Sequence, residues 1–318
     1  MTTPTGAGAP VGVLLMAHGT PRSLEELPAF YTEIRRGRPP TAAQLAELEA
    51  RYRAIGGTSP LNEVTRAQVT GVARVLERRT PQRFTVVGGA KFASPRIEEA
   101  VEELAGRAVA RIVGVVLAPH SSSVSVGEYA RRAAEALGRR PAPAPTLEMV
   151  DHWFEEPGFV ALMAERVARA VDRLGPPGEV HVLFTAHSVP VAVVEAGDTY
   201  PDQLERSARL VAEAAGLPRW SVAWQSAGRT AQEWLGPDVN AAIAALAAEG
   251  TPAVVVCPIG FVSDHLEVLY DVDVEARDSA RRAGMAFGRT ASLNDDPRLC
   301  EVLADVVLAA DRAAVDSR

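Results

Sequence analysis

Two stretches of the chain, 169 positions apart, follow the same pattern. VGVLLMAHGTP at 11–21 matches EVHVLFTAHSVP at 179–190, so that His18 corresponds to His187. In each stretch an apolar run ends at a histidine, and a proline follows three residues later. Short apolar runs of this kind are typical of buried strands. The duplication therefore predicts two similarly folded halves, each of which begins with a buried strand.

Three further pairs of matching stretches occur in the same order in both halves. RFTVVGGAK pairs with RWSVAWQSA, RIVGVVLAP with TPAVVVCPIG, and LEMVDHWFEEPGFV with FGRTASLNDDPRLC. Helical patterns separate most of them, and strand–helix alternation is typical of parallel βαβ units. The predicted fold class is α/β: two similar Rossmann-like lobes, each a mostly parallel four-stranded sheet flanked by helices. We expect the lobes over 11–150 and 151–318, after a disordered tail over 1–10.

The first two strands lie further apart in the N-terminal half than in the C-terminal half. The offset between matching stretches is 169 residues at the first strand and 136 at the second, so the N-terminal half carries 33 extra residues, near 21–62. An insertion directly after a strand falls at the edge where open α/β sheets bind ligands. We expect this insertion to form a lid or wall of a cleft. A surface decoration without function is the alternative.

Composition limits the kinds of partner. The chain has 33 basic and 40 acidic residues, so it carries no overall positive field that would hold nucleic acid or an anionic membrane. Its two cysteines, Cys257 and Cys300, are too few for a disulfide framework or an all-cysteine iron–sulfur cluster. The first ten residues have neither the charge nor the apolar run of a secretory signal. We expect a cytoplasmic protein that binds neither nucleic acid nor membrane and holds no iron–sulfur cluster.

A line of carboxylates follows one of the strands of the second lobe. In PIGFVSDHLEVLYDVDVE a helix is expected to begin near Asp264, and Glu267, Asp271 and Glu275 recur in it at a spacing of four. This spacing puts the three carboxylates on one stripe, where their repulsion favours a bound cation. A capping box formed by Asp264 and Glu267, or a solvated acidic face, is the alternative.

His187 is expected at the C-terminal end of its strand, facing the same cleft as Glu267. An imidazole and a carboxylate together offer ligands for a first-row divalent metal and two proton acceptors of different pKa. The pair therefore suggests a reaction that combines metal binding with proton removal.

Many long motifs of the chain resemble one family, the ferrochelatases, in the water-soluble form of Gram-positive bacteria that acts on coproporphyrin III. The motifs run from about 11 to 310 and include YTEIRRGRPP, AHSVP, GDTYPDQL, WQSAGRT, WLGPD and PIGFVSDHLEVLYDVDVE. The resemblance implies that Fe(II), as a substrate, is inserted into a distorted porphyrin between the lobes, with release of two protons. It implies a lyase of haem biosynthesis that needs no cofactor.

The same resemblance assigns roles to the metal-site candidates. His187 and Glu267 are similar to the paired inner-site residues of the family, which bind iron or take the pyrrole protons. Asp271 and Glu275 resemble the carboxylate line along which metal enters or protons leave, with a magnesium ion at these outer carboxylates as a further expectation. Arg51 resembles an arginine near the outer metal site; a helix-surface charge is the alternative.

Other residues are expected to contact the porphyrin. Basic side chains in RRGRPP and the GGAK segment can hold propionates, an aromatic ring in EWLGP can grip the macrocycle, and polar groups after the third strand can line the cleft. The candidates are Arg35, Arg36, Lys91, Trp234, Ser121 and Tyr129. A solvated basic turn is the alternative for the arginines.

The sequence departs from the family pattern at His18, because related soluble enzymes usually have tyrosine there. Either His18 is an axial ligand on the face of the porphyrin opposite His187, or it forms hydrogen bonds and never touches metal. Phe92 stands where some relatives have a histidine. The remaining histidines, His120, His152, His181 and His265, are assigned to structure.

Two other functions stay open. Insertion of another metal into a related tetrapyrrole is one, since a histidine and a glutamate encode metal choice poorly. A non-catalytic haem or metal carrier is the other, made plausible by His18. For the ferrochelatase hypothesis we expect porphyrin and ferrous iron as partners, a monomer, and at most transient contact with neighbouring enzymes of haem synthesis.

Overall fold

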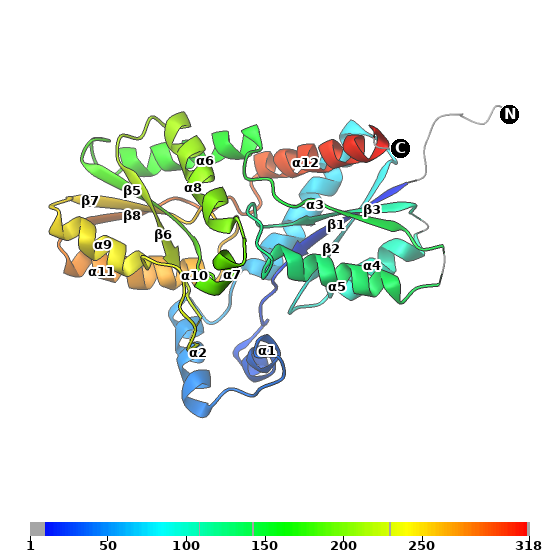
Figure 1. Cartoon of the computed structure of the whole chain (residues 1–318), viewed down its shortest axis with the longest axis horizontal. Coiled ribbons are helices and arrows are strands. Elements are labelled where there is room, and N and C mark those ends of the chain that lie inside the picture. The colour runs from blue at the N-terminus through cyan, green and yellow to red at the C-terminus, as the bar shows by residue number, and fades with distance from the viewer. Residues whose placement is uncertain (1–9, 108, 142, 229, 317–318) are drawn as a thin grey trace.

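The computed structural model describes residues 10–107, 109–141, 143–228 and 230–316. It contains two four-stranded parallel sheets, with the strand orders β2-β1-β3-β4 and β6-β5-β7-β8 (Figure 1). The predicted pair of similar α/β lobes is therefore confirmed. Of the tail expected over 1–10, all but Pro10 lies outside the described residues. The strands are β1 Val11–Ala17, β2 Phe84–Ala90, β3 Arg111–Val116, β4 Thr146–Met149, β5 Val180–His187, β6 Trp220–Gln225, β7 Ala253–Cys257 and β8 Ala286–Arg289.

The duplicated strands lie at the centre of their sheets. β1 pairs with β2 and β3, and β5 pairs with β6 and β7. All seven residues of β1 are buried, because helices cover both faces of a parallel sheet. The central position also brings the ends of β1 and β5 to the edge where ligands bind in such sheets.

Helices connect the strands of each sheet. The longer ones are α3 Leu61–Arg79, α4 Ile97–Gly106, α5 Val126–Gly138, α6 Pro157–Asp172, α8 Tyr200–Ala214, α9 Val239–Ala248 and α12 Pro297–Asp316. Shorter ones are α7 Val191–Glu195, α10 Leu266–Leu269 and α11 Arg277–Arg282, with a π-helical turn at Asp271–Ala276.

The last helix of each half crosses to the other sheet. α6 follows β4 but packs against α8, β5 and β7, while α12 follows β8 but packs against α3 and β3 (Figure 1). Asp311 of α12 is buried and accepts hydrogen bonds from Arg83 and Arg111 of the first lobe. One hydrophobic core runs through both lobes and includes Val13 and Phe184. By the sequence repeat, α6 closes the first half and α12 the second, so the two helices are exchanged between the sheets. The boundary expected at residue 150, which places α6 in the second lobe, stays a prediction.

The insertion forms a separate projection. It consists of a 3-10 turn at Leu24–Glu26, α1 Leu27–Ile34 and α2 Ala42–Ala54, and it extends below the two sheets in Figure 1. At its base, the Tyr52 and Thr20 hydroxyls are 2.9 Å apart, and the Asn62 amide donates to the Thr20 carbonyl at 2.7 Å. The predicted lid insertion of the first lobe is therefore confirmed.

Candidate active site

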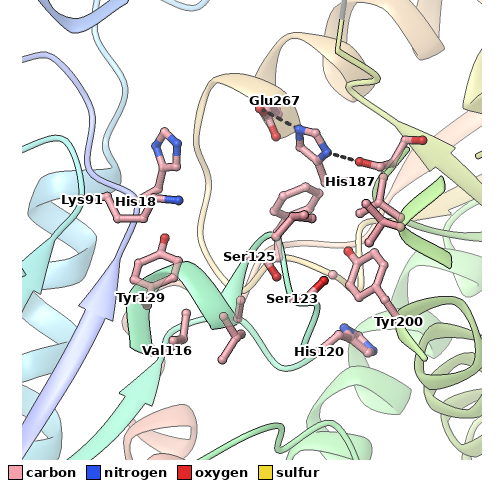
Figure 2. Close-up of a pocket in the computed structure, with 18 of the residues that line it drawn as sticks. His18, Lys91, Val116, His120, Ser123, Ser125, Tyr129, His187, Tyr200 and Glu267 are labelled. Atoms are coloured by element: carbon pink, nitrogen blue, oxygen red, sulfur yellow. Dashed lines mark hydrogen bonds and ion pairs between the residues drawn. The ribbon is translucent and has the colours of Figure 1, made fainter. Parts of the chain in front are cut away.

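A cavity of about 960 Å³ lies between the lobes. The ends of the central strands supply two of its wall residues, His18 and His187, and the lid and α3 supply Arg36, Leu61 and Thr65. Figure 2 shows His18 and Lys91 on the first-lobe side of the cavity, and His187 with Glu267 on the second-lobe side. A volume of this size is at the upper end for small-molecule sites.

His187 and Glu267 face each other, as expected. The distance from His187 Nε2 to Glu267 Oε1 is 3.5 Å, and the two side chains are 38% and 32% exposed. On its other side, the His187 ring bonds through Nδ1 to the Ser188 carbonyl at 2.6 Å. Because a carbonyl only accepts, Nδ1 carries a proton and Nε2 is the nitrogen available to the cavity.

The pair is ionised. Burial lowers the pKa of His187, but the Glu267 carboxylate and the Ser188 carbonyl raise it by more, to about 9. Burial raises the pKa of Glu267, whereas His187 and His265 hold it well below its usual range. At neutral pH the site therefore contains an imidazolium beside a carboxylate.

His265 belongs to the same cluster, although the sequence analysis assigned it to structure. Its Nε2 lies 3.7 Å from Glu267 Oε2, its Nδ1 bonds to the Ser263 carbonyl at 3.0 Å, and it lines the cavity. Its position two residues before Glu267 was the available signal. The expectation of one facing histidine missed that Glu267 has an imidazole on each side.

The helix that carries the carboxylates differs from the expectation. It begins at Leu266, and Asp264 forms no capping box with Glu267, because the Asp264 carboxylate accepts from Ser292 at 2.7 Å and Asn294 at 2.9 Å. The α-helical turn then gives way to the π-helical turn, where the Glu275 amide donates to the Tyr270 carbonyl five residues back, at 3.0 Å. Such turns are frequent at functional sites.

The three carboxylates of this segment have different surroundings. Asp271 is buried, with Arg51 of α2 and the Ser226 hydroxyl as hydrogen-bond donors, while Glu275 is exposed. Burial raises the pKa of Asp271 to about 6, against the opposing charge of Arg51. Among the described residues, no three His, Cys, Asp or Glu side chains form a group that could hold a metal ion. The magnesium ion expected at Asp271 and Glu275 stays a prediction.

A smaller cavity of about 280 Å³ lies under the lid and reaches the same cluster. Its wall includes Gln44 and Arg51 of α2, Ser226, His265 and Glu267. Arg51 therefore lies near the outer carboxylates, as the sequence suggested, and its guanidinium also stacks 4.8 Å from the centre of the Tyr270 ring.

His18 occupies the first-lobe wall with the same local geometry as His187. Its Nδ1 lies 2.9 Å from the Gly19 carbonyl, and its ring is 4.8 Å from that of Phe92. His18 is exposed to the cavity, where desolvation by the surrounding walls, and after it the positive charge of Lys91, lowers its pKa, so its ring is neutral at pH 7. A neutral imidazole can bind a metal.

Four of the six expected porphyrin contacts line the large cavity: Arg36, Lys91, Tyr129 and Trp234. Lys91 is already paired, with Nζ 2.7 Å from Glu128 Oε2. Arg35 and Ser121 are not among the residues that line the cavity, and their contacts with a porphyrin stay predictions. Arg35 lies over the Tyr31 ring at 5.5 Å instead of entering the cavity, and the Ser121 hydroxyl donates to Asp151 at 2.7 Å. Ser123 and Ser125 line the cavity in place of Ser121.

Comparison with known proteins adds to this geometry. The family model described as "Ferrochelatase" matches residues 10–311. The chain belongs to the ferrochelatase family. It is 43% identical over 316 residues to the "Ferrochelatase" of Thermus thermophilus, covering 94% of this chain and 99% of that protein. It is 41% identical over 305 residues to the "Coproporphyrin III ferrochelatase" of Geobacillus thermodenitrificans, covering 94% and 95%.

A solved structure shows the same fold at low sequence identity. The SirB protein of Bacillus subtilis, solved with Fe³⁺, superposes with a TM-score of 0.58 at 13% identity, over 95% of each chain. As a member of the ferrochelatase family, the protein is an enzyme that inserts iron into a porphyrin. No helix within the described ranges is long and apolar enough to cross a bilayer.

Proposed function

We propose that this enzyme inserts Fe(II) into coproporphyrin III, with the ring bound in the large cavity and with His187 and Glu267 acting on its inner nitrogens. The observation that carries the proposal is the facing imidazole and carboxylate, 3.5 Å apart, in the wall of a cavity of about 960 Å³. Fe(II) and the metal-free porphyrin are the substrates, and the iron porphyrin and two protons are the products. No cofactor takes part.

The ionised pair sets the order of proton transfer. Glu267 is a carboxylate at neutral pH and accepts the first pyrrole proton. His187 is protonated in the free enzyme, so it must release its proton before Nε2 can accept a second one or bind iron. Asp271, with a pKa raised to about 6, and the exposed Glu275 then lead from Glu267 to the surface, and we assign them to proton exit.

The two lobes supply the distortion that metal insertion needs. The inner N–H groups of a flat porphyrin lie in the ring plane, and iron needs lone pairs that point out of it. His18 and His187 come from opposite lobes and face one cavity (Figure 2). We assign His18 to the opposite face of the ring from His187, where its Nε2 is an axial ligand of the inserted iron. Arg36, Lys91, Tyr129 and Trp234 hold the periphery of the ring.

The choice of coproporphyrin III is supported by the printed name of the Geobacillus relative and by the basic residues of the cavity wall. Its four propionates call for more polar contacts than the two of protoporphyrin. We place the enzyme in the cytoplasm as a monomer that meets neighbouring haem-synthesis enzymes transiently. The support for a reducing compartment is that Cys257 and Cys300 are both buried and unbridged.

The test is a matrix of porphyrins and divalent metals, assayed by the absorbance change on insertion. Wild type is expected to turn over with Fe(II) and coproporphyrin III. His187→Ala and Glu267→Gln are expected to lose at least about 100-fold in kcat, within the range for lost acid–base groups, with porphyrin binding intact. His18→Tyr is expected to change the rate of product release or the metal preference. Stoichiometric binding without turnover would instead favour a carrier, and faster cobalt or nickel insertion another chelatase.

A further inference from the structure

Gln225 is a buried residue at the end of β6 that is bonded to both sides of the active site. It is 1% exposed and pairs with His187 across the sheet. Its main-chain carbonyl accepts from the Ser188 amide at 2.8 Å, and its side-chain Nε2 donates to the Glu267 carbonyl at 2.9 Å. One residue therefore connects the strand end that carries His187 with the segment that carries Glu267.

The orientation of the Gln225 amide is fixed by a second partner. The Thr185 hydroxyl, buried on β5, donates to Gln225 Oε1 at 2.8 Å. Because the Glu267 carbonyl can only accept, the amide must turn Nε2 toward it, and Oε1 then faces the hydroxyl. A buried amide that is bonded at both ends has one orientation, so it can set the position of the main chain to which it donates.

The same corner of the sheet is attached at two further points to the segment that follows β7. The Gly260 amide donates to the Thr185 carbonyl at 3.1 Å, and a Cβ atom at Gly260 would lie 2.5 Å from that of Ala186. Since a side chain would collide there, glycine lets the segment pass this close to β5. Ser226, in a left-handed conformation with φ at 59°, donates its hydroxyl to the Asp271 carboxylate.

The direction of the His187 ring depends on the same residue. His187 Nδ1 bonds to the Ser188 carbonyl at 2.6 Å. Ser188 is buried, and besides its amide bond to Gln225 its hydroxyl donates to the Leu235 carbonyl at 2.9 Å. The ring nitrogen that faces Glu267 at 3.5 Å is therefore aimed by a residue that Gln225 holds (Figure 2).

We propose that Gln225 is a positioning residue for metal insertion, which sets the distance and the angle between His187 and Glu267. Together with Thr185 it forms what we call the Gln225 bridge. The proposal rests on the proposed function, because it takes the facing pair as the groups that act on the porphyrin nitrogens. Gln225 is not among the described residues that line either cavity, so it acts through the pair. A misplacement of reacting groups by about 1 Å can cost about 100-fold in rate.

The test measures iron insertion at saturating Fe(II) and coproporphyrin III, and the porphyrin Kd separately by fluorescence titration. Gln225→Met keeps a buried side chain of similar shape but removes the donor and the acceptor. Its kcat is expected to fall about 10- to 100-fold, as when residues that orient metal-site groups are lost, while the porphyrin Kd stays within about twofold of wild type.

A pair of threonine variants isolates the hydroxyl, and decides the question should Gln225→Met fail to fold. Thr185→Val removes the donor at constant shape and is expected to lower kcat about 3- to 10-fold, whereas Thr185→Ser keeps the donor and should recover most of the wild-type kcat. Thr251→Val is the control. The Thr251 hydroxyl is also buried, just before β7, and accepts from Arg219 at 3.2 Å, so its loss should lower Tm but leave kcat unchanged.

A wild-type kcat in Gln225→Met would overturn the Gln225 bridge, as would equal kcat values in Thr185→Val and Thr185→Ser. A porphyrin Kd that rises as much as kcat falls would also overturn it, because it would show that the cavity has collapsed. His187→Ala keeps the two hypotheses apart. Insertion that survives His187→Ala contradicts the proposed function, whereas insertion that is lost in His187→Ala but kept in Gln225→Met contradicts the bridge alone.

Discussion

The protonation of His187 is the property of a single residue that most affects the proposed reaction. Its pKa is raised to about 9 mainly by Glu267 against the effect of burial, so the free enzyme holds an imidazolium below that pH. Because only the neutral ring can accept a proton or bind iron, kcat/KM for the porphyrin is expected to rise with pH between about 7 and 9. A pH–rate profile measures this, and a limb near 6.5 would contradict it.

An NMR titration of the imidazoles tests the cause of the shift. Glu267→Gln removes the carboxylate but keeps the burial, so the pKa of His187 is expected to fall below 6.5. His181, near the start of β5, is the control and should titrate as in wild type. Its Nε2 lies 2.8 Å from the hydroxyl of Ser221 on β6. An unchanged His187 would show that Glu267 is not the source.

Single residues also mark the limit of sequence reasoning. His187 and Glu267 were predictable, because one ends a buried strand and the other lies on an acidic helix. His265 had only its closeness to Glu267 in the sequence as a signal, and Ser123 and the direction of the Ser121 side chain had none. These depend on how loops after β3 and β7 turn, and loop conformation has no periodic signal in the sequence.

At the scale of the elements, the strands were the most predictable part, since burial on both faces produces continuous apolar runs. The π-helical turn at Asp271–Ala276 could not be predicted. Carboxylates four residues apart occur in an α-helix as well as in a segment that contains a π-helical turn. The position of the lid followed from the difference between the offsets of matching stretches in the two halves. Its attachment through Arg51 to the second lobe needed the structure, because the partner, Asp271, is 220 positions away.

The ion pair between Arg51 and Asp271 is expected to fasten the lid to the second lobe. Arg51→Ala leaves the Asp271 carboxyl buried without its cation, which should cost about 1–3 kcal/mol in the free energy of unfolding. Arg53→Ala, on the same helix, removes only an exposed pair with Glu49 and should cost about 0.5 kcal/mol or less. Urea denaturation measures both. Equal losses would show that the pair does not hold the lid.

For the whole molecule, the exchange of α6 and α12 was invisible in the sequence. The duplication correctly implied two similar lobes, but a repeat says nothing about which sheet its last helix covers. The structure shows that each half completes the other, with one core between them. We therefore expect both lobes to unfold in a single transition.

The buried carboxylate of Asp311 tests this exchange. Asp311→Ala leaves the buried Arg111 with only the longer, 3.6 Å contact to Glu148. We expect it to lower the free energy of unfolding by about 3 kcal/mol. Asp305→Ala, earlier in α12, removes a surface pair with Arg79 and is expected to cost at most about 1 kcal/mol. Circular dichroism and tryptophan fluorescence should give coincident transitions in both variants. Two separate transitions would mean that the lobes fold independently.

In His18, His187 and His265 alike, a main-chain oxygen close by along the chain fixes the Nδ1 side of the ring. No amino-acid replacement can delete a main-chain oxygen. The side chains around these rings could therefore change during evolution, in either half of the duplicated chain, without changing the direction in which each Nε2 points.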